Sequence, residues 1–82
     1  MTSHEEVKEL SDRFEAHRIA FEDVLAQEPS DDEKRDALQE AEEAIETLST
    51  ILVADDEELV KYEDMLTELA EKEQKLSELL GR

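Results

Sequence analysis

Apolar residues recur every three or four positions along most of this chain, which is the spacing of one face of an α-helix. The first such stretch follows Ser3 and Glu6, whose three-residue spacing is typical of a helix-capping box. Steps of three and four residues alternate along its seam, which includes one histidine. The seam residues are Val7, Leu10, Phe14, His17, Phe21 and Val24. This pattern predicts a helix over about residues 4–27.

A second helix is indicated after Pro29 and Ser30, because proline interrupts helices and Ser30 forms another capping box with Glu33. The same alternating steps place five apolar residues on one seam, and three more widen it into the broader face of a bundle helix. These residues are Leu38, Ala41, Ile45, Leu48 and Leu52, widened by Ala37, Ala44 and Ile51. The predicted helix covers about residues 31–53.

A third seam, interrupted by one acid, leads to Gly81, a natural C-cap. Its residues are Leu59, Tyr62, Leu66, Leu69, Glu73, Leu76 and Leu80, flanked by Met65, Ala70 and Leu79. Asp55 or Asp56 can cap this helix, which we expect over about residues 56–80. No glycine or proline enforces a turn before it. One continuous helix over residues 31–80 therefore stays open as an alternative.

Three helices of similar length with short connections favour an all-α fold, because such helices become antiparallel neighbours. We expect residues 1–82 to form a single domain, an up-down-up three-helix bundle with coiled-coil-like packing. The alternative is a long helical hairpin, which must dimerise to cover its apolar faces. A homo-oligomer therefore stays open.

The composition adds a strong negative charge to this picture. Twenty-six acidic residues oppose nine basic ones, and the formal net charge is -17. Such a surface repels nucleic acid and anionic lipid and attracts basic proteins, so we expect a basic protein partner and no direct nucleic-acid contact. There is no cysteine, no apolar signal segment and no stretch of membrane-spanning length, so we expect no membrane contact and a cytoplasmic location.

Part of the charge has a structural explanation, because an acid in the first turn of a helix is favourable by about 0.3–1 kcal/mol. This explanation covers the acids at residues 5–6, 31–33 and 55–58. The second helix stands out because no Lys or Arg occurs between Arg35 and Lys61. We expect the partner-binding surface to combine this helix with the start of the third. Its residues are Glu40, Glu42, Glu43, Glu46, Asp55, Asp56, Glu57 and Glu58.

Two polar residues, His17 and Glu73, interrupt otherwise apolar seams. In an up-down-up bundle they fall at similar levels, which suggests a buried or half-buried pair between the first and third helices. A His17 at the seam edge that reaches solvent is the alternative. Polar seam residues fix register or oligomeric state at a cost in stability, so replacing His17 with Leu is expected to raise the melting temperature.

No metal, cofactor or catalytic site is predicted. The Glu-x-x-His pattern of bundle di-metal sites is missing, and the acidic runs lack the glycine and alternating oxygen ligands of a calcium loop. A cysteine nucleophile, a Gly-rich phosphate loop and an HExxH motif are also missing.

These features favour a small non-enzymatic interaction or regulatory protein that binds a basic protein surface. Nucleic-acid mimicry, in which carboxylates imitate phosphates, is the strong form of this hypothesis. The alternative is a structural or assembly subunit that pairs with another chain through its apolar helix faces. Its acidity would then reflect solubility or adaptation to high salt.

Overall fold

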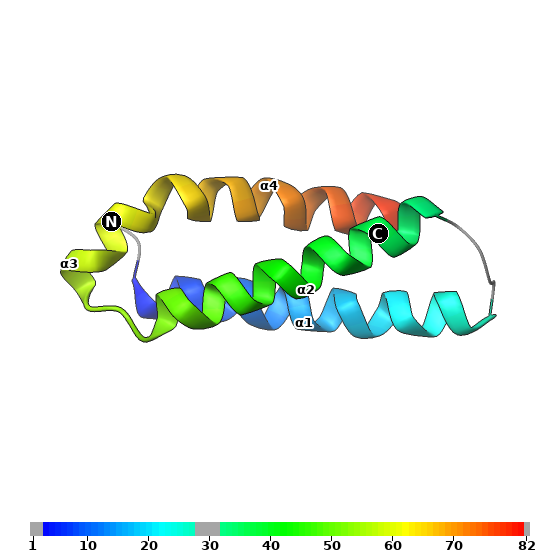
Figure 1. Cartoon of the computed structure of the whole chain (residues 1–82), viewed down its shortest axis with the longest axis horizontal. Coiled ribbons are helices and arrows are strands. Elements are labelled where there is room, and N and C mark those ends of the chain that lie inside the picture. Colours follow the sequence, from blue (N-terminus) through cyan, green and yellow to red (C-terminus); the bar gives the residue numbers. More distant parts are fainter. Residues whose placement is uncertain (1–2, 28–31, 82) are drawn as a thin grey trace.

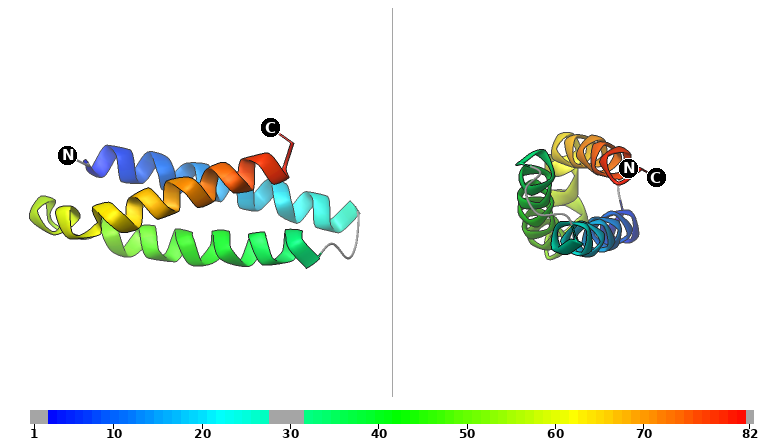
Figure 2. Two further views of the ribbon diagram at one scale, coloured as in Figure 1. Left: turned by 90° about the horizontal axis from the view of Figure 1, so that it is seen from above. Right: turned by 90° about the vertical axis from the view of Figure 1, so that its right-hand side faces the viewer.

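The apolar seams fold against one another into an antiparallel bundle (Figure 1). The computed structural model describes residues 3–27 and 32–81, apart from the side chain of Asp56. The elements are α1 (His4–Gln27), α2 (Asp32–Leu52), α3 (Asp56–Leu59), the 3₁₀ turn η1 (Val60–Tyr62) and α4 (Glu63–Leu79). The described residues are all-α and extend over 44 × 18 × 18 Å. The expected up-down-up three-helix bundle is therefore confirmed, with α1, α2 and α4 as its long members (Figure 2).

The chain turns after α2, although neither glycine nor proline occurs there. The Ala54 N–H donates to the Ile51 carbonyl at 3.0 Å. Asp55 then adopts extended backbone geometry. A continuous helix over residues 31–80 is therefore wrong, and so is the long hairpin. The physical reason is burial, because a straight helix would carry the leucines of α4 away from α1, whereas the turn returns them to the core.

The segment expected as one helix over residues 56–80 is divided into α3, η1 and α4. Asp55 is the N-cap residue of α3, but its side chain makes no capping hydrogen bond. Tyr62, the last residue of η1 and the N-cap residue of α4, leaves helical geometry with φ −98° and ψ 3°. A 3₁₀ turn rotates successive residues by about 120° rather than about 100°. The chain therefore changes direction here while Leu59 stays in the core.

The core lies where the three seams meet. Its buried cluster consists of Val7, Phe14, Phe21, Ala37, Ala41, Ala44, Leu48, Ile51, Leu59, Leu66, Leu69 and Leu76. α1 and α2 make the most extensive contact of any two helices. α2 contributes three alanines to this core, and the distance between packed helices depends on the size of the side chains between them.

Both ends of the bundle use the expected local signals. The Glu6 N–H donates to the Ser3 hydroxyl oxygen at 3.3 Å, which forms one half of the first capping box. The expected cap at Ser30 lies outside the described residues. At the other end, Gly81 has a φ of 77° and donates its N–H to the Glu78 carbonyl at 3.0 Å. Glycine adopts this left-handed conformation without the strain that a Cβ atom causes.

Two residues expected beside the third seam, Met65 and Ala70, are exposed instead. They lie five residues apart, which is about 140° around a helix. Each therefore falls on a different flank of α4, and neither flank is covered by the other helices. The apolar face of α4 is narrower than the sequence suggested.

Candidate functional site

The structure brings His17 and Glu73 together. The Nε2 atom of His17 on α1 lies 2.9 Å from Oε1 of Glu73 on α4, and each side chain is 13% exposed. An ionised carboxylate can only accept hydrogen bonds, so the imidazole carries its hydrogen on Nε2 when Glu73 is charged. The pair is half-buried at the boundary between α1 and α4, where it can hold the two helices in one register.

A third side chain, Arg13, completes this polar bridge. Its guanidinium lies 3.8 Å from Oε2 of Glu73. Arg13 is one turn before His17 on the same face of α1, so both side chains reach the same carboxylate. Sequence reasoning missed Arg13, although its four-residue spacing from His17 was a usable signal. Its side chain is 56% exposed, so its ion pair adds little stability beyond the His17–Glu73 bond.

Apart from Asp56, whose side chain lies outside the described residues, the acids expected to form one binding surface are exposed, but they do not share one face. Buried Ala41 and Ala44 mark the inner side of α2. At about 100° per residue, Glu42 and Glu46 point away from this side, whereas Glu40 lies at its edge, next to α4. The structure therefore divides the acids of α2 between an outer face and a flank.

The remaining members of that expected surface lie at the α2–α3 corner. Asp55, Glu57 and Glu58 are exposed there, and the side chain of Asp56 lies outside the described residues. Glu46 is six residues before the end of α2, about 9 Å along the helix axis. The corner acids thus form a group separate from those of α2.

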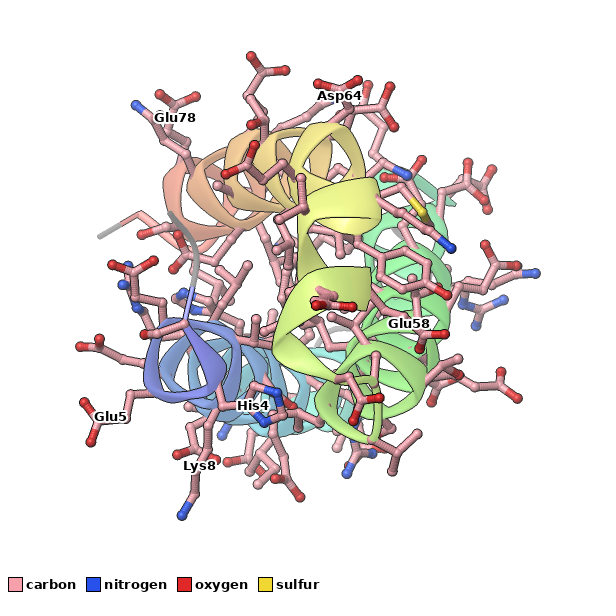
Figure 3. All side chains as sticks on the ribbon, turned by 90° about the vertical axis from the view of Figure 1, so that its left-hand side faces the viewer. His4, Glu5, Lys8, Glu58, Asp64 and Glu78 are labelled. Carbon is pink, nitrogen blue, oxygen red and sulfur yellow. The ribbon has the colours of Figure 1, made fainter. Side chains whose placement is uncertain are left out.

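Negative charge also surrounds the rest of the bundle. Seen from the corner end, Glu5, Glu58, Asp64 and Glu78 project outward from different sides (Figure 3). Acids occupy the first turns of α1, α2 and α4, where they interact favourably with the helix dipoles. Acids project from all sides of the bundle, so negative charge alone does not identify a binding site. The position of an acidic region and the apolar residues around it are needed to distinguish it from the others.

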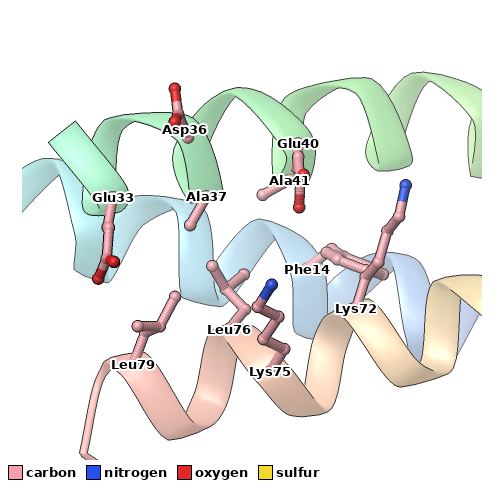
Figure 4. A pocket seen from close by; sticks show the side chains of 10 residues that line it. All are labelled: Phe14, Glu33, Asp36, Ala37, Glu40, Ala41, Lys72, Lys75, Leu76 and Leu79. Atoms are coloured by element: carbon pink, nitrogen blue, oxygen red, sulfur yellow. The ribbon is translucent and has the colours of Figure 1, made fainter.

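A groove that sequence reasoning missed lies between α2 and α4, with a volume of about 280 Å³. Its floor is apolar, and opposite charges line its two walls (Figure 4). The floor contains Phe14, Ala37, Ala41, Leu76 and Leu79, the α2 wall contains Glu33, Asp36 and Glu40, and the α4 wall contains Lys72 and Lys75. Ala37 and Ala41 leave space here, because their small side chains do not fill the gap between α2 and α4.

A wider hollow of about 640 Å³ lies between α1 and the first half of α4. Glu6 and Glu9 line it from α1, and Glu63 and Asp64 line it from α4. Arg13 is the one basic residue among its lining residues. Both walls are thus mainly acidic, in contrast to the groove between α2 and α4.

The described residues contain no group of three or more His, Cys, Asp or Glu side chains that could hold a metal ion. In the same part of the chain, no helix is long and apolar enough to cross a membrane. Comparisons with models of protein families, with curated proteins and with solved structures find no match to this chain.

Proposed function

We propose that this protein is a small non-enzymatic interaction or regulatory protein that binds a basic surface of another protein. The observation that carries the proposal is the run of exposed acids on α2 that no Lys or Arg interrupts between Arg35 and Lys61. Within the described residues, no ion pair neutralises an acid of α2. These carboxylates are therefore available to a cationic partner.

The energetic cost of the high net charge supports the same proposal. A net charge of -17 on 82 residues makes the folded chain repel itself, most strongly at low salt. A basic partner would relieve this repulsion and would be drawn to the surface from a distance. The attraction would weaken as salt rises, because exposed charges are screened. Nucleic-acid mimicry is one form of this function, in which the partner is itself a nucleic-acid-binding protein.

Capture of partners from the host lysate, with washes at low and then high salt, tests this function. Basic proteins that are retained at low salt and lost at high salt are the expected result. A variant with Glu40, Glu42, Glu43 and Glu46 replaced by Gln should retain less of them. Retention of a non-basic helical protein through the high-salt wash would contradict the proposal and favour an assembly subunit that binds through apolar surface.

A matched variant distinguishes binding by the acids of α2 from attraction by the overall net charge. Four exposed acids of α1 can be neutralised with the same change in net charge: Glu9→Gln, Asp12→Asn, Glu15→Gln and Asp23→Asn. This variant should retain the basic partners nearly as well as the unmodified protein. An equal loss from both variants would reject α2 as the binding face, although it would leave a general electrostatic attraction.

A further inference from the structure

The groove between α2 and α4 differs from the rest of the acidic surface because its floor is apolar. Phe14, Ala41 and Leu76 are buried residues of the core, and Leu79 at the groove's end is half-buried. Its volume of about 280 Å³ is at the lower limit of drug-sized ligand sites, which span about 300–1,000 Å³. The groove is therefore better suited to a few aliphatic side chains of a partner than to an organic cofactor.

The two walls carry opposite charges. Glu33 and Glu40 lie seven residues apart, or about two helical turns, and both point towards α4, whereas Asp36 between them points away from it (Figure 4). Glu33 and Glu40 therefore form one acidic line along the flank of α2. Lys72 and Lys75 are the only basic residues in the α4 sequence, and both line this groove. Within the described residues, no ion pair joins either lysine to an acid of α2. Both walls are thus available to an occupant.

The dimensions of the walls match another helix. The acidic line from Glu33 to Glu40 covers seven residues, which is two helical turns or about 10.5 Å. A helix that lays an apolar ridge on the groove floor would place its two polar edges against the two walls. A second copy of this chain is a poor occupant, because two chains of charge -17 repel each other.

We propose that the groove between α2 and α4 docks one amphipathic helix of the basic partner protein. This helix carries a two-turn aliphatic ridge, Lys or Arg on the edge that faces α2, and Asp or Glu on the edge that faces α4. The inference rests on the proposed function and specifies how the partner is held. The outer acids of α2 attract the partner, and the groove selects which part of it docks.

The unequal walls also determine the direction of the docked helix. With its ridge on the floor, a helix can lie in the groove in two opposite directions, and reversing it exchanges the edges that face α2 and α4. Two acidic walls would not distinguish these directions. An acidic wall opposite a basic wall favours one of them, because the other places like charges together.

Two synthetic 18-residue helical peptides of identical composition test this inference. Both carry the same leucine ridge and equal numbers of Lys and Glu, so that neither is attracted by net charge. One has all Lys on one edge and all Glu on the other, and the second has Lys and Glu alternating on both edges. We expect the first to bind about tenfold more tightly by isothermal titration calorimetry at low salt, the sum of several modest ion pairs.

Charge-reversed variants of the protein test whether the preference for the first peptide arises in the groove. The variant Lys72→Glu/Lys75→Glu makes both walls acidic, and it should bind the two peptides equally. Its matched control is Lys8→Glu/Lys61→Glu, which changes the net charge by the same amount at exposed positions outside the groove. This control should keep the tenfold preference. Circular dichroism checks that both variants remain helical.

The direction in which the peptide binds is a further readout, because attraction by net charge alone would favour neither direction. A spin label at the N-terminus of the edge-separated peptide should broaden NMR signals at one end of the groove. A third peptide with its two edges exchanged should broaden those at the other end. Equal binding of both compositions, labels without a preferred end, or failure of every peptide to bind would each overturn the groove proposal. None of these results would alter the lysate test, because Glu40 is the one residue shared by the groove wall and the acids neutralised in that test.

Discussion

The pairing of α1 with α2 differs from the attachment of α4 to both. On α1 and α2, Val7, Phe14, Phe21, Leu48 and Ile51 are 0–1% exposed. The core leucines of α4, Leu66, Leu69 and Leu76, are 3–7% exposed. The views along and across the bundle show α4 packed over the pair formed by α1 and α2 (Figure 2). The α1–α2 pair is thus the more completely packed part of the core.

This difference explains where the polar and open features lie. α4 meets α1 through a hydrogen-bonded bridge, His17–Glu73, in addition to apolar contacts. It meets α2 beside a groove whose floor includes Ala37 and Ala41. A helix that is packed less completely leaves room for both features. The less complete packing of α4 therefore lowers the stability of the bundle and also leaves surface that is available for binding.

The largest effect is expected from a substitution in the α1–α2 pair, the more completely packed part of the core. Replacing Phe21 on α1 with Ala removes a 0% exposed ring from the core, and should lower the free energy of unfolding by about 3–5 kcal/mol. Small domains have about 5–15 kcal/mol in total, so much of the stability would be lost. Urea unfolding followed by circular dichroism measures the change. Ile19→Ala is the control, since Ile19 is 50% exposed and should change stability by under about 0.5 kcal/mol.

A pair of identical substitutions tests the comparison directly. Leu48→Ala on α2 and Leu69→Ala on α4 remove the same atoms, but Leu48 is 0% exposed and Leu69 is 6% exposed. We expect a loss of about 3–4 kcal/mol for Leu48 and about 2–3 kcal/mol for Leu69, within the range known for such changes. Chemical unfolding of both variants gives the difference. Equal losses, or a greater loss at Leu69, would show that α4 is packed as firmly as the α1–α2 pair.

The next prediction concerns the polar bridge and revises the expectation for His17→Leu. Glu73 is only 13% exposed, so this variant leaves its carboxylate half-buried without the imidazole. We expect His17→Leu to lower the melting temperature, because the half-buried carboxylate loses its 2.9 Å hydrogen bond and keeps only the longer, exposed ion pair with Arg13. His17→Leu/Glu73→Leu should restore or raise it. A double-mutant cycle should give a coupling free energy of about 0.5–3 kcal/mol, and additive effects would mean that the pair does not act as a unit.

The smallest expected effect lies at the C-terminal end of α4. Gly81 has a φ of 77°, and an added Cβ atom would meet no neighbouring atom within 4 Å. The cost of Gly81→Ala is therefore the backbone strain alone, about 1 kcal/mol or less because a helix end frays locally. Hydrogen exchange of the last turn of α4 measures it. A loss of global stability comparable to Leu69→Ala would contradict this local role.

Much of the local structure was accessible from the sequence. Alternating steps of three and four residues located the helices to within a few residues. A helix buries one face, and the residues on that face recur every three or four positions. The same periodicity placed His17 and Glu73 at seam positions. The division of the third segment at η1 was not predicted, because a 3₁₀ turn follows from the path of the chain and not from its apolar pattern.

The flanks of the helices were harder to predict than their seams. Lys72 and Lys75 looked like ordinary solvent-facing residues of an acidic helix, and only the packing of α4 beside α2 places them opposite Glu33 and Glu40 (Figure 4). Likewise, Glu40 could not be separated from its neighbours until α4 was in position. A flank acquires its environment from another helix, so its role depends on contacts between residues far apart in the chain.

The sequence by itself determined the helices, the apolar seams, the negative charge and the seam positions of His17 and Glu73. These properties depend on residue type and on the helical repeat, which act locally. The tertiary structure decided between the expected turn at Ala54 and Asp55 and the continuous helix that the sequence left open. It alone decided that a groove with unlike walls opens between α2 and α4. Both depend on which packing buries the most apolar surface at once, and that competition involves the whole chain.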